Sequence, residues 1–531
     1  MMAGDGIVKS GTYEAVDRSW KSTCRAVLGE EIGGLAEYEG WLSEHRKPML
    51  TKKSWLSGKE VFSAITDYGQ DARFVALDEI DYGKAYSPLG IDEIKDIDSI
   101  IEALGERRAY CGNIVLGNSR NVERSSDVQN SFHILGSNFI YDSEHIAYSS
   151  NCRGSRHLFA VVSDYGCSHL IRAFETQQQS RCLEAWKCYL SSDCYFCCSV
   201  ENSQDAMFSF NLRGKRNVIG NLELTRDRYL ALKAKLLAEI RDELMERKRL
   251  PSLMEMIDAS AKPAGIGLER LPKPSGEAGE MGPIEEGFRK TTSILLGRPL
   301  EGIEAYGGWL NRHIPSVGER RSAATGRSMH VAEMLPCDLF PPERLVDQDE
   351  YMLVGERCRL EEAEIGSLDS LKKAVGSIGF VNPNGVVGEC RNAMLTPLCN
   401  TSINVYRCPI ASYNECAAYS YWPRSSKYMF GSALAFSSSF CINSYYSMNL
   451  ARTFETDCSN NCSDAYFLHN CENVRDGMFC FNAKNLRFAI GNAQMEPGDY
   501  RKAKAALLEQ MADELEKTKS LRWGVFNMGS G

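Results

Sequence analysis

ENSQDAMFSFNLRGKRNVIGN (residues 201–221) and ENVRDGMFCFNAKNLRFAIGN (residues 472–492) are two versions of one sequence, 271 positions apart. The match continues beyond both stretches, where apolar residues four positions apart indicate an amphipathic helix in each version. Near the start of the chain, AEYEGWL at 36–42 resembles EAYGGWL at 304–310. The chain of 531 residues is therefore a tandem duplication of one unit.

This duplication sets the domain boundaries that we predict. The first copy covers residues 1–250 and the second covers 284–531, and the Pro-, Gly- and Ala-rich residues 251–283 form a linker. Each copy has a helical or mixed segment (1–112 and 284–383), a β-solenoid (113–221 and 384–492) and an amphipathic capping helix (225–248 and 497–518). Because each copy contains all three parts, we expect each copy to fold on its own.

A twelve-residue period runs through both β-rich parts. Every twelfth residue is apolar or aromatic, and we call this set the large column: Leu135, Ala147, Phe159, Ile171, Leu183, Tyr195, Met207 and Ile219, then Tyr406, Ala418, Phe430, Ile442, Phe454, Tyr466, Met478 and Ile490. We predict that the large column lines the core of a solenoid. The residue before it is often apolar too, which indicates a bend or bulge at that point.

Small and turn-forming residues recur in register with the large column. Ser, Ala and Cys dominate the position two residues after it, and Asn recurs in the second copy at Asn449, Asn461, Asn473 and Asn485. Asn tolerates positive φ, and stacked Asn side chains can bond one another. We therefore predict a mainly β protein with flanking helices, in which each copy is a right-handed-type parallel β-solenoid. Its coil has 12 residues, or 24 residues in two similar halves.

Four of the eight histidines share one position of the repeat, namely His133, His145, His157 and His169. Coils stacked about 4.8 Å apart would stack these imidazoles, and neutral imidazole binds zinc and copper. The second copy has Asn404, Cys416, Tyr428 and Phe440 at the matching positions. The column is therefore either a site for zinc or another transition metal or a ladder of packed side chains. The sequence requires no cofactor.

Phenylalanine recurs at another position, as Phe196 and Phe208 in the first copy and Phe467 and Phe479 in the second. If these rings are exposed together, they form a contact surface; the alternative is that they pack beneath the capping helices. The 20 cysteines follow the twelve-residue repeat rather than zinc-ribbon spacing. We predict buried free thiols, with disulfides between coils or thiol-held metal as the alternatives.

Composition and motifs exclude several classes of protein. A hydrophobic content of 43% is typical of globular chains, and a net charge of −9 argues against general nucleic-acid binding. No run of 18 apolar residues predicts a membrane span, and the first thirty residues lack a secretory signal, so we expect cytoplasmic synthesis. The sequence contains no GxSxG, HExxH or P-loop motif.

The ends of both solenoids resemble a group of uncharacterised Cys- and Asn-rich repeat proteins from uncultured bacteria, archaea and phages. Members of that group end in a C-x-N-L-R-x-K-x-Y-x-I-x-N-x-x-Y-x-x-E-x-Y run. The matching residues here are Asn482, Asn485, Leu486, Arg487, Ile490, Asn492 and Tyr500, with Asn211, Arg216, Ile219, Asn221 and Tyr229 in the first copy. Since the group has no established activity, the resemblance implies a fold and not a function.

These observations favour a non-enzymatic scaffold that self-associates or presents a rigid surface, for example within a virion or surface assembly. One alternative is a metal- or iron–sulfur-handling scaffold, because of the histidines and cysteines. Another is a carbohydrate-active β-helix protein, which needs carboxylates or basic groups in a groove. The expected partner is a second copy of the chain or a protein assembly.

Overall fold

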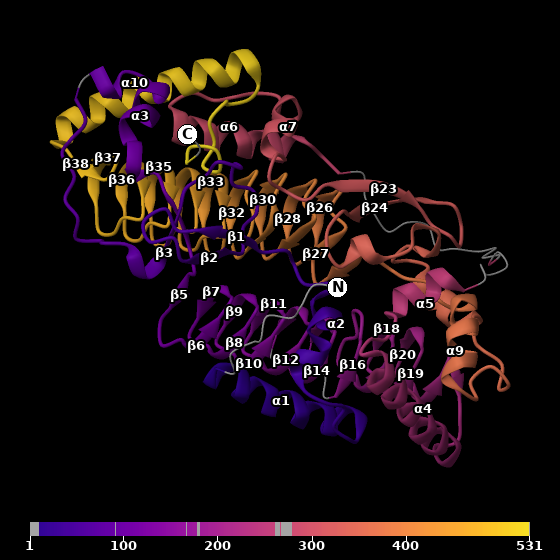
Figure 1. Ribbon diagram of the computed structural model, residues 1–531. Coiled ribbons are helices and arrows are strands. Elements are labelled where there is room, and N and C mark those ends of the chain that lie inside the picture. Colours follow the sequence, from indigo (N-terminus) through magenta and orange to yellow (C-terminus); the bar gives the residue numbers. More distant parts are fainter. Residues whose placement is uncertain are drawn as a thin grey trace.

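Two stacks of short parallel strands lie side by side in the computed structural model, which describes residues 10–90, 92–165, 167–177, 181–260, 266 and 279–529. We call the stacks the first solenoid (residues 113–221) and the second solenoid (384–492). Their strand labels run in opposite directions in Figure 1, so the two stacks are antiparallel. Phe139 of the first solenoid stacks on Tyr446 of the second, with ring centroids 5.2 Å apart.

The first solenoid is built from strands of two to four residues. They are β5 (Val115–Leu116), β6 (Arg120–Glu123), β7 (Ser126–Gln129), β8 (Phe132–Leu135), β9 (Asn138–Tyr141), β10 (Glu144–Ala147), β11 (Ser150–Arg153), β12 (Arg156–Phe159), β13 (Val162–Tyr165), β14 (Ser168–Ile171), β15 (Phe174–Gln177), β16 (Cys182–Leu183), β17 (Ser192–Tyr195), β18 (Cys198–Glu201), β19 (Gln204–Met207), β20 (Phe210–Arg213), β21 (Arg216–Ile219) and β22 (Leu222–Glu223).

The second solenoid repeats this plan, with longer strands toward its end. They are β25 (Gly385–Val387), β26 (Arg391–Met394), β27 (Leu398–Asn400), β28 (Ile403–Tyr406), β29 (Ile410–Ser412), β30 (Glu415–Ala418), β31 (Tyr421–Arg424), β32 (Lys427–Phe430), β33 (Ser439–Tyr445), β34 (Ala451–Asp457), β35 (Ser463–His469), β36 (Arg475–Phe481), β37 (Arg487–Ile490) and β38 (Ala493–Gln494).

One coil contains 12 residues and two strands. Glu144 pairs with Phe132 on one side and with Arg156 on the other, so adjacent coils are twelve residues apart. The intervening strands keep the same spacing, as Ser150 pairs with Asn138 and Val162. The register therefore decides between the two predicted coil lengths in favour of 12 residues.

Every third residue of the coil has positive φ. In one coil these residues are His133 (58°), Gly136 (55°), Phe139 (54°) and Asp142 (50°), which divide it into four sides of three residues. A non-glycine residue in this conformation costs about 1–2 kcal/mol, so the coil must hold each corner in place by other interactions. The side-chain period is consequently three, and not the period of two that extended strands have.

Residues one position after each corner point into the coil. In the first solenoid the apolar ones form a buried cluster that contains no helical residue: Val128, Ile134, Ile140, Ile146, Cys152, Leu158, Val161, Cys167, Leu170, Ala173, Cys182, Ala185, Cys188, Cys194, Cys197, Val200, Ala206, Leu212 and Val218. An equivalent cluster lies inside the second solenoid. Buried serines occupy most of the remaining inner positions. Thin coils leave room for little else, which explains the abundance of Ser, Ala and Cys.

The inner serines hold the corners by bonding two coils at once. The Ser131 hydroxyl donates to the Gln129 carbonyl in its own coil, at 2.8 Å, and accepts from the Ser143 amide one coil on, at 3.1 Å. Inner thiols make the same donation, as Cys471 Sγ does to the His469 carbonyl at 3.4 Å. Burial raises the pKa of Cys462 to about 11, so such thiols stay protonated and act as donors.

The large column does not line this interior, and that prediction is wrong. Its residues are buried outside the coils, against the helices that flank each stack. Trp20 of α1 (Gly11–Leu28) meets Phe159 edge-on at 5.2 Å, and Phe288 of α6 (Gly282–Leu296) meets Phe430 at 5.4 Å. The apolar residue before each large-column position is the inner one, because a corner of positive φ precedes it. Hence neither a bulge nor a strand of period two accounts for the pattern.

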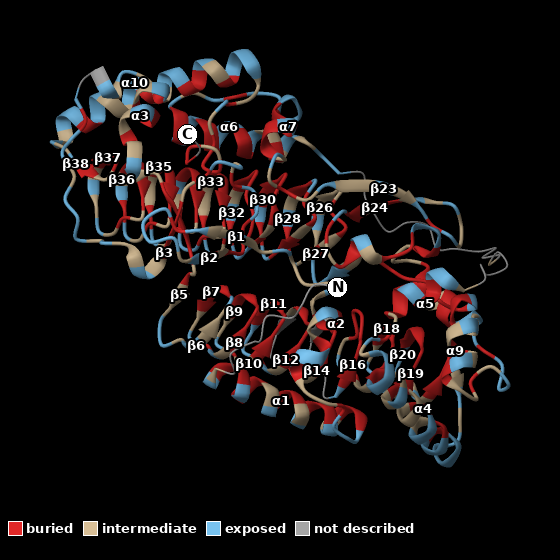
Figure 2. Ribbon diagram, viewed as in Figure 1, coloured by how far each residue is buried: buried red, intermediate tan, exposed pale blue. Residues whose placement is uncertain are grey.

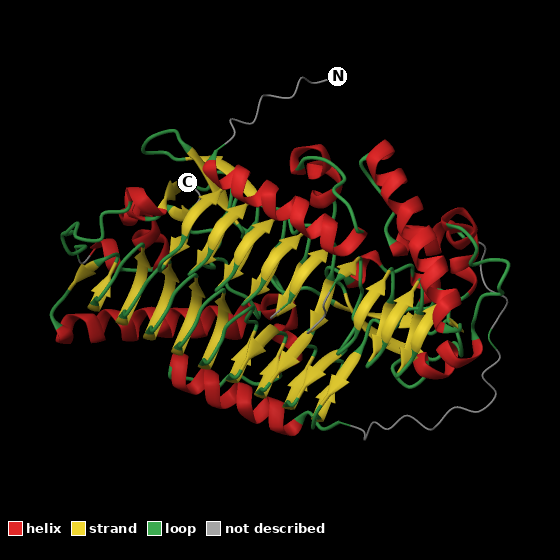
Figure 3. Ribbon diagram, turned by 90° about the horizontal axis from the view of Figure 1, so that it is seen from below, coloured by secondary structure: helices red, strands yellow, loops and turns green. Residues whose placement is uncertain are grey.

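The amphipathic helices after each solenoid lie within one residue of the predicted bounds but have a different position. They are α4 (Arg226–Arg247) and α10 (Pro497–Thr518). Lys504 of α10 lies 3.7 Å from Asp476 and donates to the Asp464 carbonyl one coil earlier, so the helix runs back alongside the stack. Figure 3 shows helices lying along the strand stacks, and Figure 2 shows their outer faces exposed. The helices α4 and α10 cover flanks rather than the ends.

The last coil of each solenoid is instead covered by the other copy. The first mixed segment has β1 (Leu50–Lys53), β2 (Glu60–Ser63), β3 (Phe74–Ala76), α3 (Ile97–Leu104) and β4 (Tyr110–Gly112); the second has β23 (Val317–Arg321), β24 (Ser328–Ala332), α8 (Tyr351–Arg357) and α9 (Leu368–Ala374). Asn482 donates to the Ala109 carbonyl at 2.7 Å, and its counterpart Asn211 donates to the Phe380 carbonyl at 2.9 Å. The two copies have therefore exchanged their mixed segments.

The chain after each flanking helix completes this exchange. Val525 donates its amide to Glu455 of the second solenoid at 2.9 Å and accepts from the Tyr110 hydroxyl of the first copy at 2.7 Å. Leu253 of α5 (Leu253–Ala259) makes the matching bond to Glu184. Helix α5 buries its apolar face although it lies inside the predicted linker, so the linker begins at about residue 260 and its centre lies outside the described residues. An isolated copy would expose all of these surfaces, contrary to our expectation that each folds alone.

Candidate functional site

The four histidines of the repeat lie in one stack beneath helix α1. Successive rings of His133, His145, His157 and His169 have centroids 5.0, 5.2 and 5.5 Å apart and planes within 29° of parallel. All four occupy corners of positive φ. Helix α1 packs along β8, β10, β12 and β14, and Ser19 of α1 lies 2.7 Å from His157 Nδ1. The stack is therefore partly covered by the protein.

This arrangement matches a packing ladder better than a metal site. The lone pairs of imidazole lie in the ring plane, so parallel rings stacked face to face cannot aim them at one ion between them. Burial lowers the pKa of His145 and of His157, which keeps them neutral, as stacked rings require. Among the described residues, no three His, Cys, Asp or Glu side chains are placed to hold a metal ion.

The four phenylalanines do not form a contact surface, and that prediction is wrong. Phe196 and Phe208 stack at 5.0 Å, Phe467 and Phe479 stack at 4.8 Å, and all four are fully buried. They occupy the corner beside the large column, so they belong to the cores beneath the flanking segments. The four rings are therefore packed under helical cover, as the alternative prediction stated.

The asparagine column lies on the surface of the second solenoid. Asn449, Asn461, Asn473 and Asn485 have φ between 55° and 57°. The amide of Asn449 donates to Asn461 at 3.1 Å, and that of Asn473 donates to Asn485 at 3.1 Å. These bonds link neighbouring coils through an exposed corner. Asn221 and Asn492 have another role. The side chain of Asn221 accepts from the Phe210 amide and donates to the Phe210 carbonyl, and Asn492 makes the same two bonds with Phe481.

A buried polar network joins the two copies where the first mixed segment meets the second solenoid. Asp457 Oδ2 accepts from the Tyr68 hydroxyl at 2.7 Å and lies 2.9 Å from His469 Nδ1. His469 Nε2 accepts from the Cys111 amide at 2.8 Å, which places the imidazole proton on Nδ1, facing the carboxylate. Asp457 and His469 have no exposed surface. Because substrate cannot reach the network, its role is to hold the two copies together.

Sequence reasoning missed this network, although a signal was present. Asp457 and His469 are one coil apart, and their counterparts in the first copy are Trp186 and Cys198. Two polar residues therefore replace two buried residues in one column of one copy. The partner Tyr68 lies in the other copy, 389 positions away in the chain, so no local pattern connects it to Asp457.

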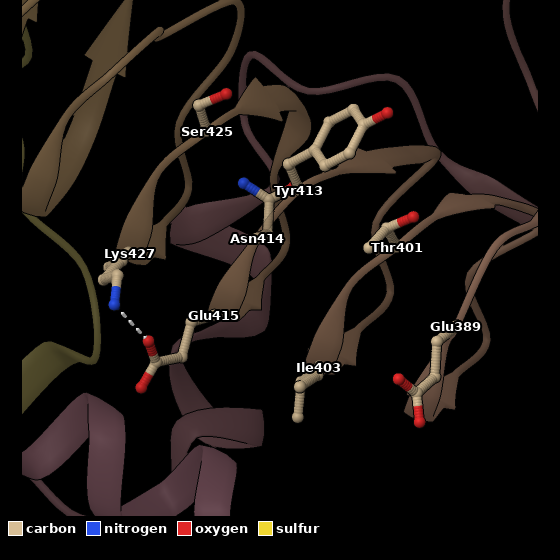
Figure 4. Close-up of a pocket in the computed structure, with 8 residues that line it drawn as sticks. All are labelled: Glu389, Thr401, Ile403, Tyr413, Asn414, Glu415, Ser425 and Lys427. Atoms are coloured by element: carbon tan, nitrogen blue, oxygen red, sulfur yellow. Dashed lines mark ion pairs between the residues drawn. The ribbon is translucent and has the colours of Figure 1, made fainter.

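A groove of about 410 Å³ lies on the outer face of the second solenoid, near its first coils (Figure 4). Its lining comes from four successive coils: Glu389, Thr401, Ile403, Tyr413, Asn414, Glu415, Ser425 and Lys427. Glu415 and Lys427 form an ion pair of 2.5 Å. Tyr413 is 51% exposed and Ile403 is 41% exposed. The groove thus combines an aromatic ring, an aliphatic side chain, hydroxyls and compensated charges.

The same face of the first solenoid has a different surface. Phe132 stands where the second solenoid has Ile403, and Glu144 pairs with Arg156 at 3.1 Å as Glu415 pairs with Lys427. At the position of Tyr413, however, the first solenoid has Asp142, which accepts from Asn130 at 3.3 Å. The exposed tyrosine of the groove is therefore specific to the second copy.

Comparisons with known proteins return no relative of this chain. No family model matches it, and the searches of curated proteins and of solved structures give no significant match. The resemblance to the Cys- and Asn-rich repeat proteins therefore stays a prediction. Within the described residues, no helix combines the length and the apolar character needed to cross a membrane.

Proposed function

We propose that the protein is a non-enzymatic scaffold that assembles with further copies of itself. The exchange of mixed segments supports this proposal, because it joins two stacks of coils into one body through buried contacts at both ends. The buried polar groups Asp457, His469 and Tyr68 serve that junction. Such a rigid, repetitive body suits a structural component of a larger assembly, such as a virion or a surface layer.

The observation that carries the self-assembly is the first strand of the second solenoid, which has a neighbouring strand on one side only among the described residues. Strand β25 is the terminal strand of its sheet, and its Val386 and Val387 are 54% and 59% exposed. At the corresponding end of the first solenoid, the side chain of Asn113 bonds to strand β2: it accepts from the Phe62 amide and donates to the Glu60 carbonyl. An exposed apolar edge strand is a template for pairing with another strand. A second copy can supply β25 itself, because two such edges pair antiparallel about a two-fold axis.

Sedimentation velocity over a wide range of protein concentration tests this assembly. We expect the wild type to associate as its concentration rises, and the double variant Val386→Lys/Val387→Lys to remain monomeric, since lysines on an edge strand oppose pairing. Leu190→Lys is the matched control, because Leu190 is 60% exposed but lies on the first solenoid. A wild type that stays monomeric throughout, or lysine variants that associate like the wild type, would contradict the proposal.

We also infer that the coils wind in the right-handed sense. Connections between parallel strands of one sheet are right-handed in nearly all proteins, because right-twisted strands pack back onto the sheet only that way. A density map that resolves the path from β8 to β10 would determine the hand, and left-handed winding would refute this inference.

A further inference from the structure

We propose that the groove on the second solenoid binds a neutral oligosaccharide, laid along the stack of coils. The groove spans four coils, and its two walls are columns of side chains that repeat once per coil, about 4.8 Å apart. One wall has Thr401, Tyr413 and Ser425, with Glu389 next to Gly388, the neighbour of Thr401 in the first coil, and the other wall has Ile403, Glu415 and Lys427 (Figure 4). A chain of similar units lying along this axis meets one side chain of each wall at each coil.

Most backbone amides of the groove lining are already bonded to neighbouring coils, so a ligand would bond mainly to side chains. The amides of Thr401 and Tyr413 donate to the carbonyls of Val387 and Asn400 in the preceding coil. The amides of Ile403, Glu415, Ser425 and Lys427 likewise donate to neighbouring coils. An extended peptide would find few backbone partners here, because β-augmentation needs unpaired groups at a strand edge. Hydroxyls and carboxylates, by contrast, are suitable partners for the hydroxyls of a sugar.

The charge of the groove favours a neutral ligand. Glu415 pairs with Lys427, and Glu389 pairs with Arg391 beside the groove, so neither carboxylate presents an uncompensated charge. An acidic glycan would have to approach both glutamates, while a basic ligand would have to displace their partners. The exposed ring of Tyr413 offers a flat apolar surface with a hydroxyl at its tip, which suits the C–H face of a pyranose.

The arrangement supports binding rather than hydrolysis. Glu389 is held by Arg391. Glu415 is also held by Lys427, so it is not poised as a general acid. The inference goes beyond the proposed scaffold, because it assigns that scaffold a ligand.

Calorimetric titration of the full chain tests the inference, with neutral hexasaccharides as probes: β-1,4-glucan, β-1,3-glucan, β-1,4-xylan and α-1,4-glucan. We expect at least one to bind, and Tyr413→Ala to weaken that binding about tenfold through loss of the stacked ring. Phe132→Ala, on the matching face of the first solenoid, should bind as the wild type does. Circular dichroism confirms that both variants remain folded.

Three results would overturn the inference: no binding of any of the four probes, binding that Tyr413→Ala leaves unchanged, or tighter binding of oligogalacturonate than of the neutral probes. A proline-rich decapeptide serves as the competing ligand, and its binding in place of the saccharides would assign the groove to peptides instead. The outcome is separate from that of the assembly experiment, because Val386→Lys/Val387→Lys removes no residue of the groove lining. If that variant no longer self-associates but still binds the saccharide, the ligand proposed for the groove is supported.

Discussion

Replacing His469 with alanine should destabilise the protein far more than the same change at the matching position of the first copy. His469 joins the second solenoid to the first mixed segment, through Asp457 on one side and the Cys111 amide on the other. Its ring also packs edge-on against Tyr110, with centroids 5.0 Å apart. Cys198, its counterpart, is equally buried but makes only a weak contact with Ser199 at 3.8 Å.

The magnitude follows from the groups that lose their partner. In His469→Ala the Cys111 amide and the Asp457 carboxylate each lose a buried hydrogen bond, at about 1–3 kcal/mol apiece. The space left by the ring adds about 1–2 kcal/mol, so we expect a total of about 3–8 kcal/mol. Cys198→Ala removes one buried sulfur atom and should cost about 1 kcal/mol.

Urea unfolding measures both variants, and hydrogen exchange shows where the structure loosens. We expect a much lower unfolding midpoint for His469→Ala, with faster exchange in the first mixed segment around residues 68–111. Cys198→Ala should leave exchange in that segment unchanged. If the two variants unfold at the same urea concentration, or if His469→Ala loosens only the second solenoid, the network does not lock the copies together.

Three further predictions concern single residues. Burial raises the pKa of Glu184 to about 7, above its value in the unfolded chain, so its stabilising contribution is complete at low pH and is lost as the pH rises through about 7. Glu184→Gln should therefore melt higher relative to wild type at pH 8 than at pH 5, and an unchanged difference would refute this reasoning. Ser459→Ala should cost about 1–3 kcal/mol in urea unfolding, because the Asp457 carbonyl loses its donor and the Cys471 amide loses its acceptor; Ser459→Cys, which keeps the donor, should cost less, and equal losses would exclude the proposed role of inner thiols. Trp20→Ala should cost about 3–5 kcal/mol, as a ring buried between helix α1 and the large column does, and a cost below 1 kcal/mol would place that ring elsewhere.

The sequence predicted the features that repeat along the chain. The duplication, the twelve-residue spacing and the bounds of α4 and α10 all follow from patterns that a packed structure imposes on neighbouring residues. Asn at the turns was also informative, because Asn449 and its column mates adopt positive φ at low cost.

The direction of the side chains could not be predicted in the same way. Residues as different as His133, Phe139 and Lys187 occupy corners of positive φ, so no Gly or Asn signal marks the three-residue period. Without that period, the large column resembles a solenoid core, and its phenylalanine neighbours resemble an outer surface. Only the positions of the corners assign Ile134 to the inside and Leu135 to the outside.

The exchange of mixed segments was invisible for a different reason. Leu104 of the first copy covers Gly491 of the second solenoid, as Leu360 of the second copy covers Gly220 of the first. Because the copies are similar, a segment presents the same apolar face whether it packs on its own solenoid or on the other one. Contacts within a copy and between copies therefore give the same sequence pattern, and only coordinates distinguish them.

Cleavage of the linker in the native protein tests the exchange most directly. A protease site inserted between residues 267 and 278 allows the folded chain to be cut, and size-exclusion chromatography of the product then reports whether the two copies separate. We predict one peak that contains both fragments, because each copy covers the solenoid end of the other and the Asp457–His469–Tyr68 network spans them. Two separate, folded fragments would contradict the account and would restore two independent copies joined by a linker.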